Sequence, residues 1–268
     1  MNRVRHAFRR MRAEGRCGLI AYVTGGDPDV ETTIRVIEAL ERAGTDAIEL
    51  GIPFSDPIAD GPVIQAAAQR ALQRGTTIHD VFEVARRIRE TSEIPLIAFS
   101  YLNPVLRFGI DKFAERAKSV GIDSLLLTDL PAERASEVKR AIRTVFLLAP
   151  TSTDARIAAV NRASDDFVYY VSTTGVTGAR KELDPALIAR LDEVRAKLTK
   201  PLAVGFGISE QRHYEELREH CDAIVVGSAI VRAIAAGDAA GAPDRAAIVV
   251  RNILGPPAHP TVVISSAK

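Results

Sequence analysis

The sequence predicts a single-domain (β/α)8 barrel, of the TIM-barrel type, on three observations. Eight short apolar runs alternate with longer segments that have the spacing of helices. The runs are apolar at successive positions, so both faces of each strand are buried, as in a parallel sheet covered by helices. The chemically unusual residues follow the runs, where the carboxyl ends of barrel strands lie. A length of 268 residues suits one such barrel.

The elements follow in chain order. The expected strands are residues 19–23, 47–50, 95–99, 124–127, 145–148, 167–171, 201–204 and 223–226. The expected helices are residues 30–43, 112–120, 132–142, 154–163, 185–198 and 210–219, and an extra helix at 78–89 is expected as an insertion after the second strand. The alternative is an open, doubly wound sheet, but no G-x-G-x-x-G fingerprint follows the first strand.

The two ends of the chain differ from this alternation. Val4, Phe8 and Met11 fall at i, i+4 and i+7, which predicts an N-terminal helix that covers one end of the core. The same segment is rich in arginine and poor in acids, so a transit peptide is the alternative. Residues 255–268 have clustered prolines and no helical period, which predicts a flexible tail after a barrel domain of residues 1–254.

Composition excludes several classes of function. The 35 Lys and Arg nearly balance the 34 Asp and Glu, and no basic tract is interleaved with aromatic residues, so we expect no nucleic-acid partner. No apolar run approaches the roughly 18 residues of a membrane span. The two cysteines, Cys17 and Cys221, are not spaced as metal ligands, so we expect no metal site and a reducing, cytoplasmic location.

Three acids stand near the end of the second strand. Glu49 ends an apolar run, and Asp56 and Asp60 lie in the Pro- and Gly-rich loop that follows. A carboxyl group beside Leu and Ile needs a strong partner or a role in proton transfer, because burial disfavours its charged form. The cluster therefore indicates acid/base chemistry. The alternative is that the two aspartates only form turns and cap a helix.

Three glycine-rich segments occur late in the chain, at residues 174–178, 205–207 and 227–231. In barrels, phosphate commonly binds after strands seven and eight, beside the N-terminus of a helix. We therefore expect a monophosphate ester to be bound here, chiefly by backbone amides and hydroxyl groups, unless these glycines only allow tight turns. The candidate residues are Thr177, Gly178, Gly205, Phe206, Gly207, Gly227 and Ser228.

Residues 48–65, IELGIPFSDPIADGPVIQ, closely resemble the signature of tryptophan synthase α chains. The similarity continues through residues 22–28, 129–131, 175–178, 205–209 and 227–231, and covers about residues 11–234 in order. The resemblance implies a (β/α)8 barrel that cleaves indole-3-glycerol phosphate into indole and glyceraldehyde 3-phosphate without a cofactor.

The resemblance also implies roles for individual residues. Glu49 would shuttle protons, Asp60 would accept a hydrogen bond from the indole N–H, and Tyr169 would lie near the reacting hydroxyl unless it is only a core aromatic. The implied indole pocket consists of Tyr22, Ile64, Phe99 and Leu126. The sequence departs from the family at Tyr22, where Phe is frequent, and at residues 172–174, where other members have Arg. Residues 172–183 have the composition of a mobile lid.

Members of this family bind a β subunit that contains pyridoxal phosphate, which implies an α2β2 assembly with residues 53–59 and 103–104 near the partner. One alternative is another phosphate-binding barrel enzyme, which predicts a lysine or histidine at a strand end. None of the five histidines follows an expected strand, and no expected strand contains a lysine. A second alternative is a subunit that mainly binds and activates a partner; the presence of both Glu49 and Asp60 argues against it.

Overall fold

The computed structural model describes residues 2–171, 185–205 and 207–255. Its strands are β1 (Gly18–Thr24), β2 (Ala47–Gly51), β3 (Leu96–Ser100), β4 (Ser124–Leu127), β5 (Thr144–Leu148), β6 (Val168–Val171), β7 (Leu202–Gly205) and β8 (Ala223–Val226). Its helices are α1 (Arg3–Ala13), α2 (Val30–Arg42), α3 (Pro62–Gln73), α4 (Ile78–Ile88), α5 (Leu102–Phe108), α6 (Ile110–Ser119), α7 (Ser136–Lys139), α8 (Asp154–Ala163), α9 (Pro185–Ala196), α10 (Gln211–Leu217), α11 (Ser228–Ala235) and α12 (Ala242–Leu254), with a 3₁₀ helix η1 at Ala132–Arg134.

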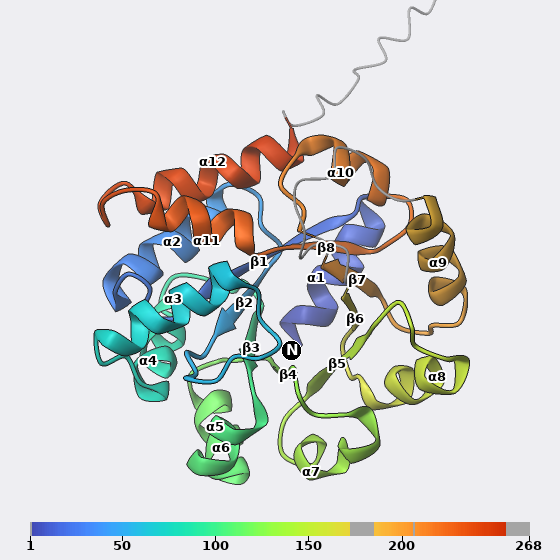
Figure 1. Ribbon diagram of the computed structural model, residues 1–268, viewed down its shortest axis with the longest axis horizontal. Coiled ribbons are helices and arrows are strands. Elements are labelled where there is room, and N and C mark those ends of the chain that lie inside the picture. Colours follow the sequence, from blue (N-terminus) through green and yellow to red (C-terminus); the bar gives the residue numbers. More distant parts are fainter. Residues whose placement is uncertain (1, 172–184, 206, 256–268) are drawn as a thin grey trace, which may run out of the picture.

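The strands form a closed parallel barrel in the order β1 to β8, with β1 paired to both β2 and β8. Figure 1 shows the strands at the centre, with helices around them and α1 across the middle of the ring. The predicted barrel is confirmed, and the alternative of an open sheet is wrong. Because all strands are parallel, their carboxyl ends meet at one end of the barrel.

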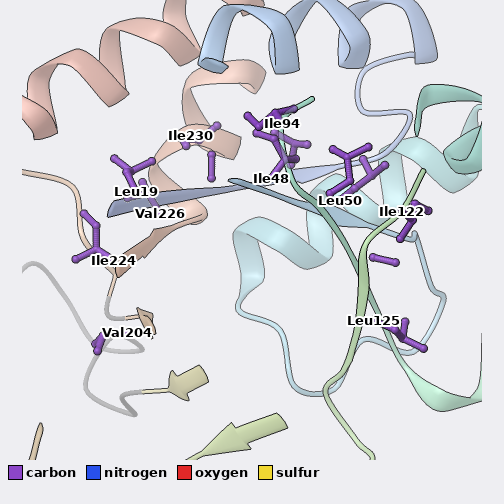
Figure 2. Packing of buried hydrophobic residues seen from close by; sticks show 14 of the residues in the cluster. Leu19, Ile48, Leu50, Ile94, Ile122, Leu125, Val204, Ile224, Val226 and Ile230 are labelled. Carbon is purple, nitrogen blue, oxygen red and sulfur yellow. The ribbon is translucent and has the colours of Figure 1, made fainter. Parts of the chain in front are cut away.

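Two apolar layers hold the barrel together. The outer layer lies between the strands and the surrounding helices, and Figure 2 shows part of it, including Leu19 of β1, Ile48 of β2 and Ile230 of α11. The inner layer fills the barrel and includes Ile97 of β3 and Phe167, which precedes β6. Both faces of the strands are therefore buried, which is why the runs are apolar at successive positions.

Helix α1 closes the amino end of the barrel. Its buried residues include the predicted stripe Val4, Phe8 and Met11, which belongs to the inner layer. The rings of Phe8 and Phe167 lie 5.3 Å apart between centroids. The prediction that an N-terminal helix covers one end of the core is confirmed.

The exposed face of α1 is tied to the barrel by charge. Four of its arginines each contact an aspartate that stands one or two residues before an even-numbered strand. The pairs are Arg3–Asp123 at 3.1 Å, Arg5–Asp166 at 3.5 Å, Arg10–Asp46 at 2.8 Å and Arg12–Asp222 at 3.8 Å. The arginine-rich start of the chain thus has a structural use in the folded protein.

The structure corrects two helix predictions. Only η1 and α7 form in residues 132–142, because the buried residues Ala132, Ala135 and Val138 are spaced by three, which suits the tighter 3₁₀ turn. The helix predicted at 78–89 is confirmed as α4, but its interpretation as an insertion is wrong, since α4 packs against α2 in the outer ring. The additional helix is α3, which packs against α11 and β1 and whose largely alanine stripe has a weak apolar signal.

The end of the chain also differs from expectation within the described residues. Helix α12, which is not among the expected helices, follows α11 and packs against α2. The predicted tail lies outside the described residues from 256 onward. None of the helices in the described ranges is both long enough and apolar enough to cross a membrane.

Candidate active site

Glu49 lies in β2 at the carboxyl end of the barrel, in register with Tyr22 of β1 and Ile97 of β3. Its side chain is 1% exposed, and its Oε1 atom has no hydrogen-bond partner among the described residues. Burial disfavours the charged form and raises the pKa of Glu49 to about 8. At neutral pH this carboxyl group is therefore mostly protonated.

Asp60 lies in the loop between β2 and α3 and is partly buried. Burial raises its pKa to about 6, while a hydrogen bond with Tyr101 acts in the opposite direction. The helix-capping alternative is wrong for Asp60, because the N-cap of α3 is Gly61 and no side chain caps that helix. Asp56 is exposed on the same loop and does not join the site.

Tyr101 is a site residue whose role the sequence analysis missed. It follows β3, is buried, and its hydroxyl accepts a hydrogen bond from the Ala59 backbone N–H at 2.9 Å. It therefore holds the loop that carries Asp60 as well as the Asp60 carboxyl group itself. The available signal was an aromatic residue with a polar group directly after a strand.

Two further phenols belong to the same site. Burial, together with the negative charges that Asp60 and Glu49 carry at the high pH where a phenol ionises, raises the pKa of Tyr22, and the same causes raise the pKa of Tyr169. Both phenols therefore remain protonated and lie within electrostatic range of the two carboxyl groups. The structure thus brings together the predicted catalytic residues Glu49, Asp60 and Tyr169, with Tyr22 beside them.

Glycines make room for these phenols. A Cβ atom at Gly51 would lie 2.2 Å from the Tyr22 hydroxyl oxygen, and one at Gly205 would lie 2.3 Å from that of Tyr169. Side chains at either position would force the phenols to move. Gly205 is also a predicted phosphate ligand, but the space that Tyr169 occupies is enough by itself to require a glycine there.

Three of the four residues predicted for the indole pocket lie in one apolar cluster. Tyr22 and Ile64 form one apolar cluster with Ala67 and Val231, and Phe99 packs against it. The rings of Tyr22 and Phe99 meet edge to face, with centroids 5.1 Å apart. Leu126 is buried in the inner layer and is in register with Phe99. Tyr22, Ile64 and Phe99 therefore share one apolar cluster, and Phe99 connects it to Leu126 in the inner layer.

The first loop positions α3 above this region. Gly25 donates a backbone hydrogen bond to the Gly51 carbonyl at 2.8 Å. The buried carboxylate of Asp27 accepts two hydrogen bonds from Arg70 of α3, at 2.8 and 2.7 Å. This bidentate pair is a strong, directional contact between the loop after β1 and the helix that carries Ile64.

The predicted phosphate site is described in part. Gly227 is the N-cap of α11 and Ser228 its first residue, and no side chain among the described residues caps this helix, so with respect to them its first backbone N–H groups are available to an anion. Gly205 ends the neighbouring strand β7, and Gly207 has a positive φ of 63°. Thr177, Gly178, Phe206 and the predicted lid lie outside the described residues.

An apolar surface adjoins the site. A cavity of about 360 Å³ is lined by residues that include Phe54 of the loop after β2 and Pro104 and Phe108 of α5. Large apolar side chains are exposed nearby along the chain, with Ile58 at 85% and Leu106 at 50%. An exposed apolar surface of this kind is typical of a protein interface.

Comparisons with known proteins agree with this geometry. A family model described as tryptophan synthase alpha chain matches residues 8–252. A tryptophan synthase alpha chain from Solibacter usitatus is 53% identical over 239 residues, which cover 87% of this chain and 90% of the relative. One from Citrifermentans bemidjiense is 47% identical over 237 residues, with coverage of 87% and 89%.

Solved structures are similar as well. The tryptophan synthase subunit alpha of Legionella pneumophila is 34% identical with a TM-score of 0.87, covering 95% of this chain and 97% of that chain. A chain from the tryptophan synthase α2β2 complex of Pyrococcus furiosus is 37% identical with a TM-score of 0.84, covering 89% and 98%.

Proposed function

Because this chain belongs to the tryptophan synthase alpha chain family, we propose that it cleaves indole-3-glycerol phosphate into indole and glyceraldehyde 3-phosphate, with Glu49 and Asp60 as the catalytic pair. The observation that supports these roles best is the separation of their pKa values, about 8 and about 6. Two carboxyl groups with separated pKa values can act as an acid and a fixed carboxylate at the same pH.

In this mechanism the neutral carboxyl group of Glu49 donates a proton to indole C3. The ring becomes an iminium ion, which accepts the electrons of the bond between C3 and the glycerol chain as that bond breaks. The resulting Glu49 carboxylate takes the proton of the hydroxyl group on the departing carbon, which becomes the aldehyde. Glu49 donates one proton and recovers one, so the cycle needs no external acid or base.

The ionised carboxylate of Asp60 accepts a hydrogen bond from the indole N–H. Positive charge develops on this nitrogen when C3 is protonated, so Asp60 stabilises the transition state more than the ground state. Tyr169 remains a neutral donor next to the reacting hydroxyl. Tyr22, Ile64, Phe99 and Leu126 form the apolar slot for indole.

The phosphate group would bind at the N-terminus of α11, with Gly227 and Ser228, and next to Gly205 and Gly207. Thr177, Gly178 and Phe206 complete the proposed set. The helix terminus supplies backbone donors and the positive end of its dipole, which suits a monophosphate ester.

The partner in this proposal is a tryptophan synthase β subunit in an α2β2 assembly, as in the complex from Pyrococcus furiosus. The α chain of this family has no cofactor, and pyridoxal phosphate belongs to the β subunit. The apolar surface of Phe54, Ile58, Pro104 and Leu106 is the proposed contact. The free thiols of Cys17 and Cys221 suit a cytoplasmic location.

The test is to incubate the purified chain with indole-3-glycerol phosphate and to measure indole release, with and without a β subunit. We expect indole in both samples and a faster release in the second. Absence of indole from both samples would refute the lyase proposal. Stimulation of the β reaction without any cleavage would instead identify an activating subunit.

A further inference from the structure

The two cysteines of the chain meet at the amino end of the barrel. They are 204 residues apart in sequence, yet their Sγ atoms lie 3.7 Å apart. Cys17 directly precedes β1 and Cys221 stands two residues before β8. These are the first and last strands, whose pairing closes the barrel. The thiol pair therefore lies at the seam of the fold.

The backbone at this seam suits a disulfide. Gly18 is in register with Ala223, and the Gly18 N–H donates to the Asp222 carbonyl at 2.9 Å, so Cys17 and Cys221 are one residue out of register. A lateral spacing of about 4.8 Å and a rise of about 3.3 Å place their Cα atoms roughly 6 Å apart. Disulfides favour Cα separations of this size.

The surrounding contacts hold both cysteines in place. The Tyr214 hydroxyl donates to the Cys17 carbonyl at 2.9 Å, and the Cys221 thiol donates to the Leu217 carbonyl at 3.3 Å. The side chains are 3% and 2% exposed, but both line a cavity of about 340 Å³ next to α1. A small oxidant can enter a cavity of this size.

We propose that Cys17 and Cys221 form a modification site, a dithiol that hydroperoxides oxidise to an intramolecular disulfide joining β1 to β8. One thiolate attacks a peroxide oxygen, giving a sulfenic acid and, with hydrogen peroxide, water. The second thiol attacks the sulfenic sulfur, forms the S–S bond and releases a second water. In total the two thiols lose two electrons and two protons, and the peroxide is reduced.

The reaction is expected to be slow in the reduced protein. The hydrogen bond with Cys17, followed by burial, raises the pKa of Cys221, so little of its reactive thiolate is present at neutral pH. In a reducing compartment the pair stays a dithiol, and sustained peroxide exposure converts it. Glu49 lies at the other end of the barrel, so oxidation leaves the catalytic groups in place.

The product would close a loop that spans most of the chain. A cross-link over a long loop restricts the unfolded chain more than the folded one. We therefore expect oxidation to raise the midpoint of thermal unfolding by about 5–15 °C. Indole formation at room temperature is expected to stay unchanged.

The experiment treats the purified full-length chain with hydrogen peroxide and compares it with a dithiothreitol-reduced sample. We expect a monomer about 2 Da lighter in intact mass, no thiol that iodoacetamide can alkylate after denaturation, and the higher unfolding midpoint. Addition of dithiothreitol must restore the original mass and midpoint.

The controls are Cys17→Ala and Cys221→Ala, each of which leaves one thiol and must lose the stabilisation. The mass and alkylation results on the parent chain decide the proposal even if these variants fold poorly. Two free thiols after peroxide treatment would overturn it, as would oxygen addition at either cysteine or an intermolecular dimer.

Discussion

At the scale of single residues, Glu49 and Asp60 have the same functional group in different surroundings. Glu49 is buried in the barrel, and its Oε1 atom has no hydrogen-bond partner among the described residues, whereas Asp60 lies on a partly exposed loop and contacts Tyr101. Burial raises both pKa values, but by different amounts, because the first group is desolvated more completely. This difference supports the proposed roles of Glu49 as proton donor and Asp60 as carboxylate at neutral pH.

Glu49→Gln is expected to lower kcat by about 10²–10⁴-fold, because it removes proton transfer and keeps the shape of the side chain. The assay is indole release at saturating substrate, with substrate binding measured separately by calorimetry. Binding is expected to be retained. Normal turnover by this variant would show that Glu49 is not the proton shuttle.

Glu49→Gln also tests how the buried carboxyl group makes the free energy of unfolding depend on pH. The folded pKa of Glu49, about 8, lies above its unfolded value, so the folded state binds the extra proton between about pH 4.5 and 8. The free energy of unfolding then falls by up to about 1.4 kcal/mol per pH unit across that interval, and levels off above it. Urea unfolding should therefore find Glu49→Gln as stable as the parent near pH 4.5 and more stable at pH 8.

The rate is expected to follow a bell-shaped pH profile. Asp60 must be ionised, so kcat/KM rises through about pH 6; Glu49 must be protonated, so it falls through about pH 8. Asp60→Asn is the matched control, which should be slower and should lose the acid limb while keeping the alkaline one. An alkaline limb that keeps rising would mean that Glu49 enters the reaction as a base.

At the scale of elements, α1 and α3 pack near opposite ends of the barrel by different means. Helix α1 places Phe8 and Met11 into the amino end and surrounds them with arginine pairs. Helix α3 packs against β1 and α11 through small side chains and is joined to the loop after β1 by the Arg70–Asp27 pair. Helix α1 therefore has a structural role at the amino end, while helix α3 contributes Ile64 to the proposed site.

Asp46→Asn is expected to lower the free energy of unfolding by about 2 kcal/mol. The buried Asp46 carboxylate accepts hydrogen bonds from Arg10 and Arg16, at 2.7–2.8 Å, and from the Leu19 N–H, so the variant removes the buried counter-charge of both arginines and leaves them only the half-exposed Glu14. The expected loss of unfolding free energy is smaller than for a fully buried ion pair, because both arginines are partly exposed.

Arg12→Gln is the matched control on the same helix. Its contact with Asp222 is 3.8 Å long and Arg12 is largely exposed, so the expected loss is below about 0.5 kcal/mol. Urea unfolding of both variants measures the difference. Equal losses would mean that the Asp46 cluster contributes no more than a surface ion pair.

At the scale of the whole molecule, the two ends of the barrel have different chemistry. The carboxyl end carries the proposed catalytic groups together with exposed apolar side chains, and the amino end carries helix α1 with its arginine pairs and the thiol pair. A partner that receives indole would be expected to bind at the first end, next to where indole is released.

Leu106→Asp on α5 is expected to weaken binding of a β subunit by at least about 10-fold, because it places a charge in an apolar contact. Ile248→Asp on α12 is the matched control: Ile248 is similarly exposed, at 49%, but lies on a different part of the barrel ring. Calorimetric titration of the β subunit into each variant measures the effect. Equal weakening by both would argue against the proposed contact surface.

The sequence alone determined the barrel, its eight strands to within about one residue at each end, and the α1 stripe, because burial on one or both faces imposes a repeating pattern on neighbouring residues. It also predicted Glu49, Asp60 and Tyr169 as one site. Only the tertiary structure decided the rest: that α3 is the added helix, that Tyr101 holds Asp60, and that Cys17 meets Cys221. These are contacts between residues far apart in the chain, and their geometry depends on barrel closure, which no local pattern records.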